Sequence, residues 1–375
     1  MNPTEKDIDL YNRDGVVCLR NVINSDWLAF LATGVSDLAK EPGAMSQTIT
    51  SAGSSLVYST DLELAQHISK FDHFARCSPC AGIAGGVLQS EEINFLYDQY
   101  FCQQYRPDQN SSKPNNGTAT TTTGQSSTAG IATTNTAPPS TPWHQDQPYW
   151  SVEGKQVVSL WIPLDATPPG FEVQFIQGSH QWQEHCPIKF ASNTEYKNTG
   201  QPSLPNIDTG IAEGTYKVLS FPDCLPGDVI VFSANTVHGQ NMKRSEGDCC
   251  ARSVSDADSW WSKHLQFRRL ATRYTGDDAR YKIRQGEAGV IPSQLYPALG
   301  LKEGGRLTCA RLPLVWTRRE GLVATSSNSN KNELSQRTTT ETTTRATTTT
   351  TTTGGVARSP AFFAGETKTT NSSSV

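Results

Sequence analysis

The sequence lacks any run of about 18 apolar residues, so it predicts no membrane-spanning helix. It also lacks an apolar segment behind Met1, because Glu5, Asp7 and Asp9 follow at once, and this argues against a secretory signal. Basic residues do not cluster, and the net charge is −4. We therefore expect a cytoplasmic protein with a small-molecule substrate and with no nucleic-acid or membrane partner. The oligomeric state is left open.

Regular cysteine spacing is also missing. The nine cysteines are odd in number, and Cys77 and Cys80 form a lone CxxC without a second pair at zinc-finger spacing. We expect mostly free thiols in a reducing compartment and no structural zinc.

Hydrophobic residues make up only 35 % of the chain, and the deficit lies in two Thr/Ser/Asn-rich stretches, 107–141 and 321–375. Such stretches cannot bury enough apolar surface to offset their ordering entropy, so both are predicted to be disordered. The first interrupts two strand-like segments, which makes it an insertion and not a domain boundary. Residues 1–320 are therefore predicted to form one domain.

Several short apolar segments with Gly/Pro turns between them predict β-strands. They cover residues 157–164, 171–176, 216–221, 229–232 and 267–274. Asn24-Ser25-Asp26 supplies an N-cap for a helix over 27–40 near the amino terminus. Many short strands without intervening helical patterns predict a mostly β sandwich or jelly roll with flanking N-terminal helices.

A His-X-Asp motif and a distal histidine are the candidate metal ligands. In a strand, His144 and Asp146 would project from one face. His238 follows a Pro-Gly-Asp turn and an apolar strand, and it would complete a triad of two imidazoles and one carboxylate. Such a facial triad leaves three positions open on iron(II). We therefore predict that the three side chains converge.

The strand over 267–274 carries three arginines that could bind a carboxylate. Arg268 shares a face with Leu270 and Thr272, whereas Arg269 and Arg273 share the opposite face. Spacing alone does not decide between them. The small and apolar neighbours of Arg268 are typical of a barrel interior, and two permanent charges on the other face fit solvent or a rim.

Several motifs together resemble the phytanoyl-CoA dioxygenase family, from about residue 8 to 318. They are Leu96-Tyr97-Asp98, the segment 141–150 (TPWHQDQPYW), 160–165 (LWIPLD), 178–182 (GSHQW), Pro226-Gly227-Asp228, Val237-His238-Gly239, 268–281 and Leu314-Val315-Trp316.

The resemblance implies a double-stranded β-helix that uses iron(II), 2-oxoglutarate and dioxygen, with ascorbate as an optional addition. It assigns the iron to His144, Asp146 and His238, and the 2-oxoglutarate carboxylate to Arg268. Trp161 is implied in the cosubstrate pocket, with plain core packing as the alternative.

Two features depart from the family pattern. Gln103 stands where relatives carry a cosubstrate-binding lysine, which removes one positive charge from the pocket. The segment 244–266 lengthens the connection between His238 and Arg268, and it could be a lid or a surface loop.

The resulting hypothesis is a dioxygenase that couples 2-oxoglutarate decarboxylation to hydroxylation of an aliphatic C–H bond. Asp146 favours hydroxylation, because its loss would open a position for halide. A non-catalytic jelly-roll binding module and a cupin-type metalloenzyme are the alternatives. No coenzyme A site is recognisable, and the substrate is not identified.

Overall fold

The computed structural model describes residues 2–50, 56–106, 141–190, 192–240, 263–287 and 299–322. Most of the predicted insertion and tail, and most of the segment 244–266, lie outside these residues. β5 begins at Thr141, the last residue of the predicted insertion, and β17 spans Gly321–Leu322, the first two residues of the predicted tail.

Two capped helices flank the first strand at the amino terminus. Thr4 and Asp7 form a capping box at the start of α1 (Glu5–Asp14), and Gly15 ends it with a φ of 78°. β1 (Val16–Leu19) follows, and then α2 (Ser25–Lys40), whose first turn is capped by the Asn24 side chain as predicted.

The long strands form a nine-stranded antiparallel sheet. β12 (Val229–Ser233) pairs with β1 and β7 (Val157–Pro163), and β14 (Gln266–Thr275) pairs with β7 and β4 (Glu92–Tyr105). Beyond β4 lie β3 (Leu56–Leu62) with β2 (Gln47–Thr50), and β16 (Leu314–Thr317) with β17.

A four-stranded sheet faces the large one. Its order is β11 (Val218–Ser220), β8 (Gln174–Ile176), β13 (His238–Gln240) and β5 (Thr141–His144). Smaller elements are β6 (Val152–Glu153) with β15 (Arg280–Tyr281), β9 (Ile188–Lys189) with β10 (Thr194–Glu195), and α5 (Ile207–Ala212). The predicted double-stranded β-helix is confirmed.

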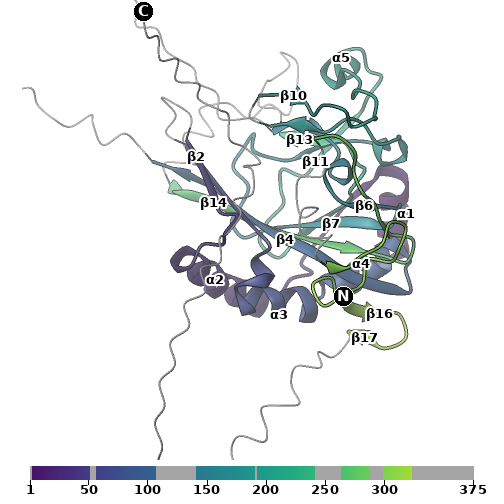
Figure 1. The fold of residues 1–375 in the computed structure, drawn as a ribbon. Helices are drawn as coiled ribbons and strands as arrows, with labels where there is room; N and C mark the ends of the chain where they lie inside the picture. Colours follow the sequence, from purple (N-terminus) through teal and green to yellow (C-terminus); the bar gives the residue numbers. More distant parts are fainter. Residues whose placement is uncertain are drawn as a thin grey trace, which may run out of the picture.

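Helices cover the outer face of the large sheet. In Figure 1, α2 and α3 (Ser69–Cys77) lie on the side of the sheet opposite to β11 and β13. Phe71 and Phe74 of α3 share one apolar core with Leu160 of β7 and with Leu270 and Tyr274 of β14. The outer face of the large sheet therefore contributes to the apolar core under the helices, and the polar side chains that this sheet contributes to the pocket come from its inner face.

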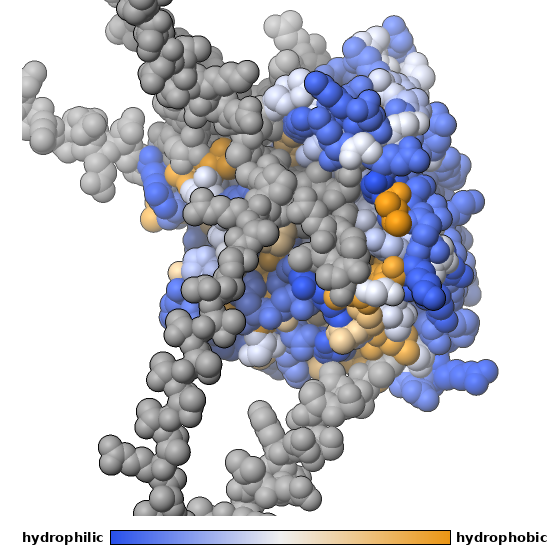
Figure 2. All heavy atoms as spheres, in the orientation of Figure 1, coloured by the Kyte–Doolittle hydropathy of each residue, from blue (hydrophilic) through white to orange (hydrophobic). Residues whose placement is uncertain are grey.

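The described surface is mostly hydrophilic on the face seen in Figure 2, where hydrophobic atoms form small patches between hydrophilic ones. No helix in the described part of the chain has both the length and the apolar character to cross a bilayer. The cysteines within the described ranges are all free thiols, as expected.

We predict that Gly85 of α4 (Cys80–Leu88) tolerates no side chain, because a Cβ there would lie 2.4 Å from the indole ring of Trp316. Gly85→Ala should therefore lower the free energy of unfolding by about 1–3 kcal/mol. Gly82→Ala is the matched control, since its Cβ would lie 3.6 Å from the same indole and would add helix propensity. Urea unfolding of both variants measures this, and equal effects would contradict it.

Candidate active site

Two histidines face each other across the small sheet. His144 is the last residue of β5, His238 is the first of β13, and the two are direct partners in the antiparallel pairing. Their ring centroids lie 4.3 Å apart. Gly239 allows this close approach, because a Cβ there would meet the carbonyl oxygen of Thr141 at 2.9 Å.

The structure brings Asp146 to the same point. Its Oδ1 lies 3.6 Å from Nε2 of His144 and 3.7 Å from Nε2 of His238. One potential ligand atom from each residue lies within 4.8 Å of the others, and all three residues are buried. The three predicted ligands therefore form one compact group inside the barrel.

Asp146 reaches this point by a route that differs from the prediction. It does not continue the strand of His144 but precedes the 3-10 turn η3 (Gln147–Tyr149), with helical φ and ψ of −74° and −43°. Its backbone N–H and that of Gln147 both donate to the carbonyl of Ala234, which follows β12. The expectation of one shared strand face is therefore wrong, and a turn held to β12 aims the carboxylate.

Backbone carbonyls fix both imidazoles in the orientation that a metal requires. Nδ1 of His144 lies 2.8 Å from the oxygen of Pro142, and Nδ1 of His238 lies 2.9 Å from the oxygen of Thr236. A proton on each Nδ1 leaves each Nε2 with a lone pair directed towards Asp146. This is the usual arrangement of metal-binding histidines.

The pKa values of Asp146 and His238 favour the protonation states that bind a cation. Burial alone would raise the pKa of Asp146, but His238, His144 and Arg273 together hold it well below its usual range. Burial and the neighbouring His144 lower the pKa of His238 to about 4. The site therefore holds a carboxylate and a neutral imidazole at neutral pH.

Arg268 lies on the face opposite to the one predicted. It forms a bidentate ion pair with Asp165, with both hydrogen bonds at 2.8 Å, and it does not line the pocket. The alternation of faces was correct, but their assignment was wrong. The apolar neighbours of Arg268 belong to the outer face, which the helices cover, and not to the interior.

Arg269 and Arg273 instead point into the barrel and line the pocket that also contains the three metal-ligand candidates. They are 3 % and 4 % exposed. Arg269 donates to Gln103 Oε1 at 3.1 Å, and Arg273 donates to Gln99 Oε1 at 3.0 Å. Burial lowers the pKa of Arg269 to about 10, so it stays charged at neutral pH.

Aromatic rings form the remaining wall around Arg269. Its guanidinium lies 5.4 Å from the ring centroid of Trp161 and 6.0 Å from that of Phe101. The structure thus places Trp161 in the pocket lining. Gln103 is buried and does not line the pocket itself. It contacts Arg269, which does.

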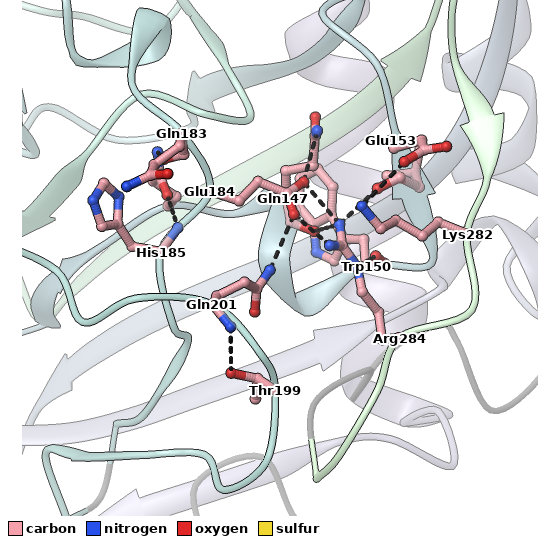
Figure 3. A network of polar contacts seen from close by, with 12 residues as sticks. Gln147, Trp150, Glu153, Gln183, Glu184, His185, Thr199, Gln201, Lys282 and Arg284 are labelled. Atoms are coloured by element: carbon pink, nitrogen blue, oxygen red, sulfur yellow. Dashed lines mark hydrogen bonds and ion pairs between the residues drawn. The ribbon is translucent and has the colours of Figure 1, made fainter.

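An ion pair with largely buried side chains, which the sequence reasoning missed, supports the turn after Asp146. Figure 3 shows Arg284 reaching towards Glu184 and Gln147. Its guanidinium donates to both carboxylate oxygens of Glu184 and to the carbonyls of Gln147, Trp150 and Val152. No local motif signals this pair, because its members lie 100 positions apart in the chain.

We predict that Arg284→Met destabilises the protein strongly, because it leaves Glu184 charged and nearly buried and three carbonyls without this donor. The free energy of unfolding should fall by about 3–5 kcal/mol. Lys282→Met is the control, since its ion pair with Glu153 in the same network is half exposed and is worth about 0–1 kcal/mol. Equal losses in urea unfolding would show that burial of the pair is not what matters.

A double-stranded β-helix with a buried His-X-Asp…His group and inward-facing arginines defines the class of non-haem iron, 2-oxoglutarate-dependent oxygenases. The family model of phytanoyl-CoA dioxygenase (PhyH) matches residues 11–248, which is more than half of the chain. The chain therefore belongs to the phytanoyl-CoA dioxygenase family.

Solved structures share this fold at low sequence identity. The epimerase SnoN, in complex with Fe3+, alpha ketoglutarate and nogalamycin RO, is 16% identical with a TM-score of 0.52, covering 83% of this chain and 97% of its own. The carbocyclase SnoK from nogalamycin biosynthesis is also 16% identical with a TM-score of 0.52, covering 83% and 96%. No curated protein matches the sequence significantly.

Proposed function

We propose that the protein couples the oxidative decarboxylation of 2-oxoglutarate to hydroxylation of an aliphatic C–H bond in a small organic substrate. The observation that carries this proposal is the pairing of His144 with His238, with both Nε2 atoms directed at Asp146.

His144, Asp146 and His238 would hold iron(II) by two imidazole nitrogens and one carboxylate oxygen, which leaves three positions open. A bound iron(II) would activate dioxygen, of which one oxygen atom would oxidise 2-oxoglutarate to succinate and CO2 and the other would enter the C–H bond as a hydroxyl group. Ser159 donates to Asp146 Oδ2 at 3.2 Å, which leaves Oδ1 for the metal. Since Asp146 takes a position that a halide would need, hydroxylation is favoured over halogenation.

Arg269 is the proposed partner of the distal carboxylate of 2-oxoglutarate. This carboxylate is at the end of 2-oxoglutarate opposite to the 2-oxo acid group that chelates the metal. The arginine farther from the triad is therefore the better candidate to bind it. Arg273 pairs in register with Ser159, which contacts Asp146, whereas Arg269 pairs with Pro163 at the other end of β7. A guanidinium fork gives the bidentate, permanently charged contact that a carboxylate needs.

The two alternative functions fit the pocket less well. A cupin-type enzyme or a binding module that uses no acidic cosubstrate has no need for Arg269, and an unpaired buried cation is costly to keep. Within the same class, SnoN is described as an epimerase and SnoK as a carbocyclase. Hydroxylation is the outcome proposed for this chain because Asp146 supplies the carboxylate of the triad and aromatic side chains line the pocket.

We predict that succinate formation from 2-oxoglutarate requires iron(II) and is abolished in His144→Ala. Iron affinity should fall by more than about 100-fold, because even the outer partners of metal ligands contribute 10- to 100-fold. His180→Ala is the control, since the His180 ring contacts the Asn12 carbonyl and does not line the pocket. Metal-independent turnover, or turnover without 2-oxoglutarate, would refute the proposed function. Ascorbate is included in the assay.

We predict that Arg269→Gln weakens 2-oxoglutarate binding while iron binding survives. Loss of one partner of a buried charge pair costs about 2–5 kcal/mol, which is roughly 30-fold or more in affinity. Arg268→Gln should change the affinity within about threefold, because Arg268 contacts Asp165 on the outer face. A titration of 2-oxoglutarate compares the two, and a larger loss for Arg268→Gln would restore the original assignment.

A further inference from the structure

A second buried arginine lines the pocket and is not used by the proposed function. Arg273 is 4 % exposed, and its Nε and Nη1 have no hydrogen-bond partner among the described residues. Within the described part of the chain, Nη2 is the guanidinium nitrogen that forms a hydrogen bond, and its acceptor is Gln99. A guanidinium with two buried donors left over is expensive unless a ligand takes them.

The acceptor that holds Arg273 is neutral. Gln99 receives the Nη2 hydrogen bond with its Oε1 and donates its own Nε2 to Thr60 Oγ1 at 3.0 Å. It therefore orients the guanidinium without compensating its charge. The pair Arg269–Gln103 repeats this arrangement four residues earlier on β14 and four residues later on β4.

Formal charges leave the pocket positive even with its cofactors bound. Among the described lining residues, two arginines face one carboxylate, Asp146. Iron(II) adds two positive charges, and 2-oxoglutarate brings two negative ones. One positive charge then remains uncompensated, and a single further carboxylate would neutralise it.

Arg273 lines the pocket on the side of the candidate metal ligands, where a primary substrate would bind. It lies beside Asp146, because its strand partner Ser159 donates to that carboxylate. Its guanidinium lies 4.4 Å from the ring centroid of Tyr97 and 5.3 Å from that of Trp150. These two rings offer an apolar wall next to the two free donors.

We propose that Arg273 binds a carboxylate of the primary substrate, so that the substrate is a small carboxylic acid whose apolar part packs against Tyr97 and Trp150. This inference rests on the proposed function and names the substrate class of the same site. Arg269 binds the cosubstrate and Arg273 binds the substrate. Gln103 and Gln99 of β4 each accept a hydrogen bond from one of them and orient its guanidinium.

The test uses the full chain loaded with Mn(II) and 2-oxoglutarate, and it measures binding by calorimetry. The probes are phenylacetate, cyclohexanecarboxylate and octanoate, each paired with its primary amide. We expect at least one acid to bind roughly 10- to 100-fold more tightly than its amide, as hydrogen bonds to a charged group allow. A panel in which no acid exceeds its amide overturns the proposal.

Two matched variants assign the preference to one arginine. Gln99→Glu gives Arg273 a built-in carboxylate without removing it, and it should abolish the acid preference while 2-oxoglutarate affinity changes within about threefold. Gln103→Glu should weaken 2-oxoglutarate binding and leave the acid preference in place, because its carboxylate neutralises Arg269. If both variants weaken 2-oxoglutarate equally, Arg273 belongs to the cosubstrate site and the inference is wrong.

A purely structural role for Arg273 has a different signature. Arg273→Gln should lose the acid preference and Arg273→Lys should restore part of it, with amide binding nearly unchanged in both. Equal loss of acids and amides would overturn the inference in favour of a structural role. Failure of the wild type to bind 2-oxoglutarate is a separate result, which refutes the proposed function itself.

Discussion

The antiparallel pairing of β5 with β13 is the contact on which the site depends. It sets His144 opposite to His238, and Gly239 permits the approach because a Cβ there would meet the backbone of β5. Asp146 completes the group from a turn tied to the end of β12. Three strands of two sheets therefore meet at one point, where His144, Asp146 and His238 are all buried.

The two arginines that line the pocket differ from two other arginines of the fold in the charge of their partners. Arg269 and Arg273 each contact a glutamine, whereas Arg284 and Arg268 are paired with carboxylates. Neutral partners hold a guanidinium in place but leave its charge available to a ligand. The charge of the partner therefore distinguishes Arg268 and Arg284, which form ion pairs within the fold, from Arg269 and Arg273, which we propose bind ligand carboxylates.

The motifs of the sequence were sufficient for much of the fold and for bringing together the candidate metal ligands. Short apolar segments between Gly/Pro turns matched β7, β8, β11, β12 and β14, because strands buried on both faces appear as short apolar runs bounded by turn residues. The sequence selected His144, Asp146 and His238 as candidates because the residue types and the strand before His238 are local features, and the structure places the three side chains together. The ion pair of Arg284 with Glu184 left no such trace, since its members meet only through the fold.

The sequence by itself determined which residues of β14 share a face, because side chains in a strand alternate whatever surrounds them. Only the tertiary structure decided which face looks inward. The sheet is buried on both sides, so apolar neighbours mark the face under α2 and α3, and the arginine face lines the cavity. Likewise, the sequence named Asp146 as a ligand, but the turn at Asp146 and its hydrogen bond to Ala234 decided how the carboxylate reaches the metal position.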